Sequence, residues 1–514
     1  MSTADSERSK PAGGNGGRLR SSATAIGGTV IGAAANFAMI AIVAASYTGV
    51  VFGTLSAVTA FFQLTSVTVR LGTDVAATYF IGREATDQRV PQARRVLTVT
   101  VIPVAVVTSA IAAVAIWQSD QLATWLAEPG ERAEYAQMLE IIAIALPLSA
   151  VGEVLMSATR GFSTMIPTVL GVNLGRQCGQ LILVSAAAVF AAGEADALAY
   201  AWSAPFLATL IVPAVWLVRR GVLRTSAPNR PEPTGAVWAY AAPQAAGAAV
   251  QGGLEKADIM MLNSMVGADA AGDYNLANRF VHLFTLVRYA LATSQAAAIA
   301  QDLRTRNWSS VYDRHAQVSA WALTLCGPGL VIFAALPEAF LGLVNDGLTD
   351  GATALRILSL GMLVSLVLGH GLPIVSLSGA ATRAFAYNAT SLVMNLVANV
   401  ILIREFGTAG AAWAWAAATV FPRAAAYRYV NRKFDIHLFS EPVIFACVIT
   451  ATTAAIATAG RLFLGDEQRT VFIVVPIAII VWAAMVGGWR KRLGLQRNPD
   501  DDSRLTYAHS VSGS

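Results

Sequence analysis

The run "GTAGAAWAWAAATV" (407–420) combines small residues with closely spaced tryptophans, and "GEADALAYAWSAP" (193–205) follows the same pattern far upstream. Both runs begin with glycine and then place two aromatic residues in an alanine-rich stretch. Alanines let helices pack closely, and Trp202, Trp413 and Trp415 can fill gaps or anchor a helix at the membrane boundary. The two runs therefore predict the same structural position in two copies of one unit.

Two further matches occur in the same order along the chain. "ATRGF" (158–162) returns as "ATRAF" (381–385), and a glycine followed 21 residues later by an arginine occurs at Gly49 and again at Gly267. Single matches in an alanine-rich chain can be coincidental, but three ordered ones predict an internal duplication.

The composition indicates a membrane protein. The 514 residues are 55% hydrophobic and 13% charged, with a mean hydropathy of +0.56. A soluble protein of this length needs more charge, whereas apolar runs of about 20 residues can each cross a bilayer as a helix. We predict an all-α polytopic protein with about fourteen transmembrane helices. The predicted spans are 23–47, 52–81, 95–117, 137–158, 165–191, 196–218, 237–265, 273–300, 316–341, 353–378, 384–404, 408–429, 441–463 and 470–489.

Basic residues set the predicted orientation. With the N-terminus in the cytoplasm, most of the 36 Lys and Arg residues fall in cytoplasmic segments. Those that fall outside are Arg132, Lys256, Arg404, Arg461 and Arg469. We therefore expect a multi-pass protein of the bacterial plasma (inner) membrane with both termini cytoplasmic. The net charge of +5 is spread over many short loops, which disfavours nucleic-acid binding, and the three cysteines lie inside spans, so neither a disulfide nor a metal site is indicated.

Six spans per copy is an even number, so both copies enter the membrane from the same side. This predicts two six-helix lobes related by a pseudo-twofold axis along the membrane normal, plus two extra C-terminal helices. The predicted segments are a disordered cytoplasmic tail (1–22), an N-lobe (23–218), a cytoplasmic linker (219–236), a C-lobe (237–429), two added spans (430–489) and a C-terminal tail (490–514).

Three stretches resemble a known family. "YNATSLVMNLVANVILIREFGTAGAAWAWA" (387–416), with spaced Asn395 and Asn399, is similar to the eleventh-to-twelfth helix region of polysaccharide transporters, the O-antigen-type flippases of the multidrug/oligosaccharidyl-lipid/polysaccharide (MOP) exporter superfamily. "EKADIMMLNSMVGADAAGDYNLANR" (255–279) resembles their seventh-to-eighth helix junction, and "VVFGTLSAVTAFFQL" (50–64) their second helix.

The resemblance implies a MOP/MATE-like transporter without a cofactor. Its substrate would be a polyprenyl-diphosphate-linked oligosaccharide, a cell-surface glycan or cell-wall precursor, moved from the cytoplasmic to the outer leaflet by alternating access. Membrane lipid and glycan assembly enzymes are the further candidate partners, and a Na⁺ or H⁺ gradient is the candidate driving force.

Arginines inside the spans are the first candidate site residues. An arginine at mid-membrane usually faces protein or a wet cavity, and guanidinium groups suit a diphosphate. The duplication would place Arg70 and Arg288 across a central cleft, with Arg176 close to mid-depth. The alternative for Arg70 is an internal ion pair with Asp74, four residues later, and Glu153 could reach Arg176 from the neighbouring span.

Arg279 and Arg356 lie in the outer parts of their spans. They could receive the phosphates before release, or their side chains could reach the membrane boundary as interfacial arginines do.

Three residues are candidates for ion coupling besides Asp74 and Glu153. Glu255 and Asp258 are three apart on one predicted helix, where they could hold a cation or proton, or act as ordinary polar groups at the headgroup boundary. His370, in "LGHGLP", lies where Gly369 and Pro373 should interrupt a helix; it could relay protons or be a structural histidine.

No catalytic motif is present in the sequence. A phosphate-binding glycine loop is missing, so we expect no ATP hydrolysis, and no nucleophile–base arrangement stands out. A multidrug/cation antiporter of the same superfamily is the alternative function; the deepest charges are mostly arginines, which repel cationic drugs. A membrane glycosyltransferase is disfavoured because the first external loop is only "SYTGV" (46–50).

Overall fold

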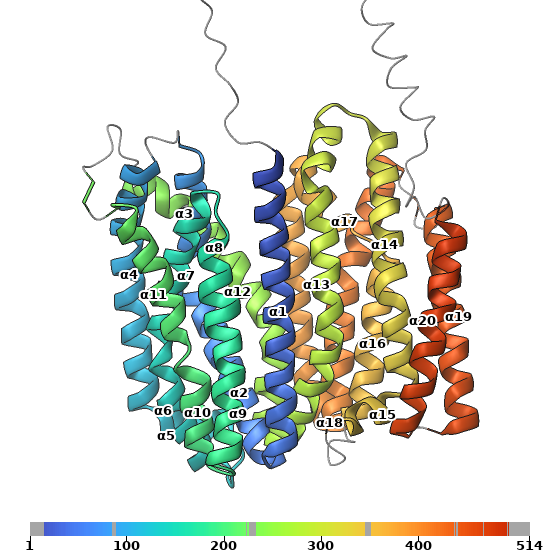
Figure 1. Ribbon diagram of the computed structural model, residues 1–514, viewed down its shortest axis with the longest axis horizontal. Helices are drawn as coiled ribbons and strands as arrows, with labels where there is room; N and C mark the ends of the chain where they lie inside the picture. The colour runs from blue at the N-terminus through green and yellow to red at the C-terminus, as the bar shows by residue number, and fades with distance from the viewer. Residues whose placement is uncertain are drawn as a thin grey trace, which may run out of the picture. The chain divides into compact units, whose positions relative to one another are not determined.

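The computed structural model describes residues 15–84, 89–222, 224–225, 233–344, 351–435, 437, 440–465, 467–490 and 492. All regular structure in these ranges is helical (Figure 1). The helices in the first half are α1 (Asn15–Ser46), α2 (Gly49–Val69), α3 (Thr73–Gly82), α4 (Arg89–Trp117), α5 (Ser119–Leu126), α6 (Arg132–Ala143), α7 (Ala145–Gly161), α8 (Ile166–Thr168), the π-helix η1 (Val169–Cys178), α9 (Gly179–Phe190), α10 (Ala195–Ser203) and α11 (Phe206–Arg219). Those in the second half are α12 (Thr234–Met265), α13 (Ala268–Arg304), α14 (Trp308–Ala335), α15 (Pro337–Gly342), α16 (Gly351–Val367), α17 (Gly371–Val375), the π-helix η2 (Ser376–Ala380), α18 (Ala381–Phe434), α19 (Glu441–Leu464) and α20 (Gln468–Trp489).

Each predicted span coincides with one helix or with consecutive helices. In the described part of the chain, nine helical stretches are long and apolar enough to cross a membrane. One of them, Gly371–Phe434, contains more than one predicted span. Inside it the chain turns at Gly407, whose φ of 54° and ψ of −128° interrupt α18. The predicted all-helical, multi-pass fold is confirmed.

The repeated glycines lie at turns. Gly407 divides α18 into two halves, and Gly193, which the predicted duplication pairs with it, has a φ of 86°. Left-handed backbone of this kind favours glycine. Gly410 allows the two halves of α18 to approach each other, because a Cβ added there would overlap the carbonyl group of Leu402.

The predicted span 52–81 is two helices instead of one. Leu71 (φ 54°) and Gly72 (φ 70°) form a left-handed turn between α2 and α3. A Cβ at Gly72 would overlap the backbone of Ala241, so the close approach of α12 accounts for the glycine. The sequence around the break contains Arg70, Gly72 and Asp74, but apolar residues resume at Val75, so the predicted span continues through it.

The chain forms two compact units. Unit 1 comprises Met1–Val43, Phe62–Ser119 and Gln137–Ala249, and unit 2 comprises Ala44–Phe61, Asp120–Ala136 and Val250–Ser514. Each unit is therefore built from three separate segments of the chain, whereas each predicted lobe is one continuous segment. The lobe boundaries remain a prediction. Residues 223 and 226–232 of the predicted linker, residues 491 and 493–514 of the predicted C-terminal tail, and residues 1–14 of the predicted N-terminal tail lie outside the described residues; α1 already begins at Asn15.

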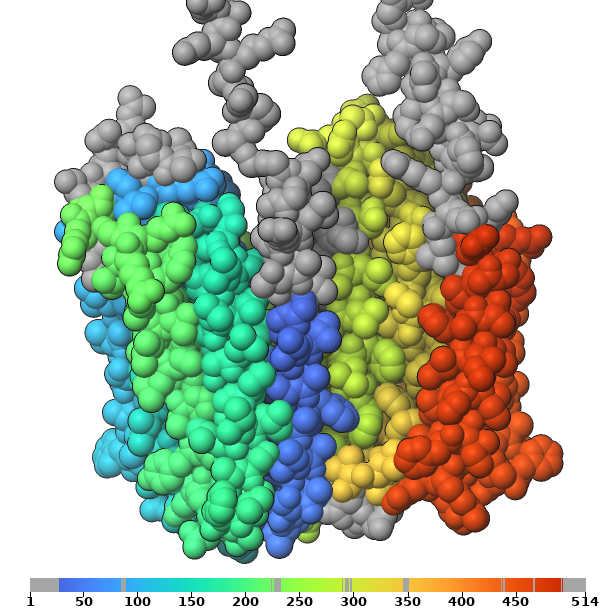
Figure 2. Space-filling view, viewed as in Figure 1, coloured from blue at the N-terminus to red at the C-terminus, as the bar shows by residue number. Residues whose placement is uncertain are grey.

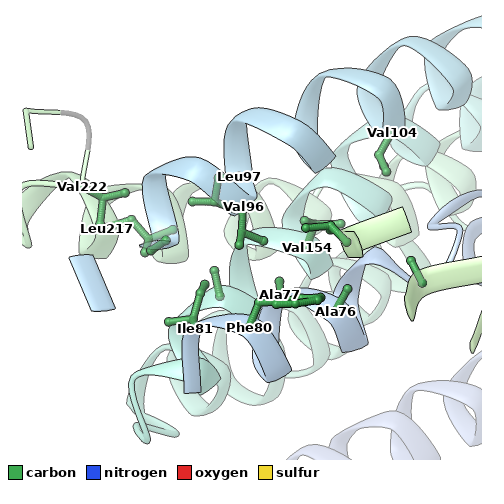
Figure 3. Close-up of a cluster of buried hydrophobic side chains, with 14 of the residues drawn as sticks. Ala76, Ala77, Phe80, Ile81, Val96, Leu97, Val104, Val154, Leu217 and Val222 are labelled. Atoms are coloured by element: carbon green, nitrogen blue, oxygen red, sulfur yellow. The ribbon is translucent and has the colours of Figure 1, made fainter. Parts of the chain in front are cut away.

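Unit 1 has an aliphatic core between four helices. Phe80 of α3, Val96 of α4, Val154 of α7 and Leu217 of α11 are almost fully buried against one another (Figure 3). This core fixes α3, which carries Asp74, and α7, which carries Glu153 and Arg160.

Unit 2 is held by small residues and a separate aliphatic cluster. A Cβ added at Gly361 of α16 would lie 2.6 Å from the Cβ of Ala416, so the alanine-rich run of α18 packs directly on α16. Leu336, Ala457 and Val474 are buried where α19 and α20 meet the end of α14. The outer side chains of α19 and α20 form a continuous exposed face (Figure 2), as expected for lipid contact.

Candidate functional site

In unit 1, Arg70 belongs to a network of ion pairs. Its guanidinium is 3.2 Å from Asp74 and 3.9 Å from Glu153. Glu153 is also 3.5 Å from Arg160, which sequence analysis did not select. The Arg70–Asp74 pair, which spans the turn between α2 and α3, is the internal pairing that the sequence offers as the alternative to phosphate binding. Two cations and two carboxylates thus largely neutralise one another.

Arg176 is a third cation beside this network. It lies on η1, close enough to Glu153 and Arg70 for their charges to interact. Its guanidinium carbon is 5.2 Å from the centroid of the Phe206 ring, and its Nε is buried without a hydrogen-bond partner in the described residues. π-Helical segments are often found at functional sites. Arg176 is therefore the cation of unit 1 with the clearest capacity for an added anion.

In unit 2, Arg288 lies on α13 in a basic environment. Its Nε is buried and has no hydrogen-bond partner, and no carboxylate in the described residues is within ion-pair distance of it. Its charge acts on His370 and on Arg423. His315 is a further neighbour of His370. A buried guanidinium without a counter-charge is costly, so this group of four residues favours an anion.

A helix break brings His370 into this group. Helix α16 ends at Val367 and α17 begins at Gly371, with Gly369 at a φ of 75° between them, as the glycines and Pro373 predict. His370 is buried, and both of its ring nitrogens lack a hydrogen-bond partner in the described part of the structure. An interrupted helix at membrane depth is typical of transporter binding sites.

Asp258 forms a separate polar cluster in unit 2. Its side chain on α12 is 1% exposed, and it accepts hydrogen bonds from the hydroxyl of Tyr274 (2.8 Å) and the amide of Asn399 (2.6 Å). The same amide is 3.2 Å from the side-chain oxygen of Asn395. Asn399 therefore connects α18 to α12, whereas its bond to Asn395 lies within α18. Asp258 thus provides a buried carboxylate surrounded by oxygen and amide groups.

Glu255 does not share this cluster. It is exposed and accepts a hydrogen bond from Gln251 at 2.8 Å, one turn earlier on α12. Its charge acts on Lys256 and Arg279. Residues three apart on a helix point about 60° apart, which is enough to place Asp258 in the core and Glu255 at the surface.

Arg356, in the first two turns of α16, already has hydrogen-bond and ion-pair partners. It donates to the carbonyl of Ala334 (3.1 Å) and lies 3.3 Å from Glu338. Arg461 reaches the same carboxylate at 3.8 Å. Arg356 therefore ties α16 to the end of α14 and to α15.

Sequence reasoning missed Arg423, His315 and Tyr274. Arg423 is the first residue of a basic run that the orientation rule counts as cytoplasmic, yet in the structure it is partly buried and lies close enough to Arg288 for their charges to interact. His315 belongs to no recognisable motif, and Tyr274 stands in the stretch 255–279 that resembles the transporter family but was not selected as a site residue; the packing of α14 and α13 brings them to their clusters. Among the described residues, no group of three or more His, Cys, Asp or Glu side chains could hold a metal ion.

Comparisons with known proteins identify the fold. No family model matches the sequence, and no curated protein matches it. Solved structures do match. A lipid II flippase MurJ in an inward closed conformation has a TM-score of 0.70 at 11% identity, covering 92% of this chain and 99% of that chain.

Two other matches extend the comparison. An inward-facing multidrug resistance MATE family transporter of the MOP superfamily has a TM-score of 0.64 at 14% identity, covering 84% of this chain and 99% of that chain. A MOP superfamily transporter from Pyrococcus furiosus Vc1 (DSM3638) has a TM-score of 0.57 at 16% identity, covering 85% and 95%. At such identities the similarity establishes the MOP/MATE-like fold, as predicted; the matched proteins are transporters and not enzymes.

Proposed function

We propose that this chain is a flippase that moves a polyprenyl-diphosphate-linked oligosaccharide from the cytoplasmic to the outer leaflet by alternating access. The MOP/MATE-like fold supports a transporter, and the lipid II flippase among the similar structures supports a lipid-linked substrate. The family suggested by the sequence, the O-antigen-type flippases, belongs to this proposal.

The observation that carries the proposal is the basic cluster of unit 2. Arg288 and Arg423 are partly buried beside the buried His315 and His370, and neither arginine has a carboxylate partner in the described residues. Inserting one arginine at mid-membrane costs about 2.5–3.5 kcal/mol, and a diphosphate offers the oxygens that would offset such a cost. A cationic drug would meet repulsion at this place.

In unit 1, Arg176 is the proposed second contact for the substrate's phosphates. Arg70 would act mainly by holding Asp74 and Glu153, and so by setting the local field around Arg176. Arg279 and Arg356 remain proposed contacts on the path of release, although Arg356 would first have to leave Glu338.

Energy coupling is assigned to the Asp258 cluster. A buried carboxylate with Tyr274, Asn395 and Asn399 around it can take up a proton or a monovalent cation, and its occupancy would change the packing of α12, α13 and α18. Glu255, Asp74 and Glu153 are weaker candidates because each has another partner. His370 could relay protons within the basic cluster.

Replacing Arg288 by alanine tests the proposal. We expect translocation of a fluorescent polyprenyl-diphosphate oligosaccharide in proteoliposomes to fall roughly tenfold or more, since charge-assisted hydrogen bonds contribute about 1.5–3 kcal/mol. Arg404→Ala, at an exposed position beyond the basic cluster, is the matched control and should retain full activity.

The same vesicles distinguish the antiporter alternative. Gradient-driven efflux of cationic dyes that is insensitive to Arg288→Ala, together with no movement of the lipid-linked substrate, would favour a multidrug/cation antiporter. Wild-type flipping by a folded Arg288→Ala protein would rule out the basic cluster as the phosphate site.

A further inference from the structure

A basic pocket lies in unit 2 between the first turns of α18, near Arg383, and its last turns, near Arg432. Because the chain reverses at Gly407, the first and last turns of α18 meet at the same end of the unit. Between them is an open pocket with a volume of about 620 Å³. Its charged and aromatic lining residues are Arg383, Tyr387, Arg428, Tyr429, Arg432 and Lys433.

Within the described part of the chain, the four cations of this pocket have no acidic partner. Its lining contains no carboxylate, and no salt bridge in the described residues involves any of these cations. Asp435, the nearest acid in sequence, is 3.5 Å from His437 instead. Arg428 and Arg432 are four apart on one helix, where like charges repel. The pocket therefore suits an oxyanion such as a phosphate or phosphodiester group.

Tyr429 organises the pocket. The Arg383 guanidinium lies 4.9 Å from the centroid of its ring, and the Lys433 ammonium lies 5.3 Å from it while donating to its hydroxyl at 2.9 Å. Lys433 also lies 5.2 Å from the Phe434 ring, which stacks on Trp308 at 4.9 Å. Cation–π contacts of this kind hold two of the charges in place without neutralising them.

The surroundings favour a lipid over a soluble anion. Phe385, between two lining residues in the chain, is 41% exposed, and Leu377 on the adjoining η2 is 42% exposed. Apolar side chains at this position can contact acyl chains while the cations face the headgroup layer, where tyrosines are also common. Basic pockets between helices on the cytoplasmic side of membranes bind anionic headgroups.

We propose that this pocket binds the phosphodiester headgroup of an anionic phospholipid in the leaflet that the basic residues assign to the cytoplasm. Such a lipid bridges the two halves of α18 and thereby stabilises unit 2. The site is separate from the buried cluster of Arg288, so it does not depend on the identity of the transported substrate.

The experiment uses the full-length protein in detergent, titrated with phosphatidylglycerol or phosphatidylcholine while thermal unfolding and lipid retention in native mass spectrometry are followed. We expect phosphatidylglycerol, and not phosphatidylcholine, to raise the unfolding temperature and to stay bound. Arg428→Gln combined with Arg432→Gln should weaken this binding roughly tenfold or more, because each Lys or Arg near an anionic lipid contributes about 1 kcal/mol of binding free energy.

The matched control is Arg404→Gln combined with Arg469→Gln, which removes two exposed charges of unit 2 at other positions and should bind like the wild type. Arg383→Gln, on the other half of α18, provides a second test in the same direction. Equal binding by the pocket and control variants would overturn the proposal. So would inorganic phosphate that competes at the same concentration as phosphatidylglycerol, since the site would then recognise a free anion.

Discussion

At the scale of single residues, the charged groups inside the helices fall into two kinds. Arg70 and Arg356 each have carboxylate partners, at 3.2 and 3.3 Å, and these pairs connect neighbouring helices. Arg176 and Arg288 each keep a buried Nε without a hydrogen bond in the described residues. Since a buried, uncompensated charge is costly, retention of the second kind points to a ligand, whereas the first kind can be explained by structure alone.

The depth of these residues could be predicted, but their partners could not. Hydropathy places Arg176 and Arg288 inside spans, and the four-residue spacing of Arg70 and Asp74 predicts a pair. Nothing in the sequence indicates that Arg423 turns inward beside Arg288 while the next arginine, Arg428, is exposed. That difference depends on how α13 packs on α18.

Asp258→Asn is predicted to separate coupling from binding. The amide keeps the shape of the side chain and an acceptor for Asn399, but it removes the charge that a proton or cation would neutralise. We expect flipping to lose its response to an imposed Na⁺ or H⁺ gradient, with a loss of stability of about 1–3 kcal/mol from an imperfectly matched hydrogen bond to Tyr274. Transport in proteoliposomes with and without each gradient measures this effect.

Glu255→Gln is the control for that experiment. Its side chain is exposed and accepts a hydrogen bond from Gln251, so gradient dependence should persist. A gradient response that survives in Asp258→Asn but disappears in Glu255→Gln would move the coupling site to the exposed carboxylate.

At the scale of helices, α2 and α13 meet through glycines within unit 2. A Cβ added at Gly53 would overlap the backbone of Ala268, and one added at Gly272 would lie 2.9 Å from the Phe52 ring. Asn275 then donates to the hydroxyl of Ser56 at 2.8 Å. The predicted duplication pairs these two helix starts, at Gly49 and Gly267, and the structure places them in contact.

Gly53→Ala should therefore destabilise unit 2. The added methyl group would lie 2.8 Å from the Cα of Ala268 and force the helices apart, at a cost of about 1–3 kcal/mol. Gly247→Ala on α12, where no atom lies within 4 Å of the added Cβ, should be neutral or gain about 0.5–1 kcal/mol. The melting temperatures of both variants in the same detergent measure this difference. Similar values would mean that α2 and α13 have room for a methyl group at Gly53.

The start of α13 also predicts a pH dependence. Glu131 accepts a hydrogen bond from the backbone N–H of Ala268, with both carboxylate oxygens about equally distant at 3.1 and 3.0 Å. Burial, followed by the charges of Glu128 and Asp269, raises the pKa of Glu131 above its usual 4.5, although the hydrogen bond from Ala268 lowers it. The folded state thus holds this proton more tightly than the unfolded state does.

The resulting stabilisation is complete below pH 4.5 and is lost as the pH rises through the raised pKa. Glu131→Gln keeps an acceptor for Ala268 and removes the titration. As the pH is raised from 4.5, the melting temperature of this variant should fall less than that of the wild type. Parallel curves for the two proteins would show that another group dominates.

The helices themselves were largely predictable, because apolar runs and basic flanks determine where a chain crosses a membrane. The breaks were less so. The turn at Leu71 and Gly72 lies between two apolar stretches that together have the length of one long span, and η1 differs from an α-helix mainly in its hydrogen bonding. The interruption at His370 was predictable because glycine and proline flank it.

At the scale of the whole molecule, the duplication and the basic residues together predict one orientation. The turn of α18 at Gly407, next to Arg404, should face the outside, and the last turn of α18, with Arg432, should face the cytoplasm. Hydropathy alone is symmetric about the membrane plane, so only the distribution of Lys and Arg determines the direction. The same orientation places the basic pocket in the cytoplasmic leaflet.

Single cysteines test this orientation. Cys326 is fully buried, so Cys178→Ser with Cys447→Ser provides a background in which Arg404→Cys or Arg432→Cys supplies the exposed thiol. In intact bacteria, a membrane-impermeant maleimide should label the first thiol and reach the second only after the cells are lysed. Because both positions are exposed and belong to the same helix, equal labelling of detergent-solubilised protein controls for reactivity. The reverse pattern would place the basic pocket in the outer leaflet and overturn the predicted direction of transport.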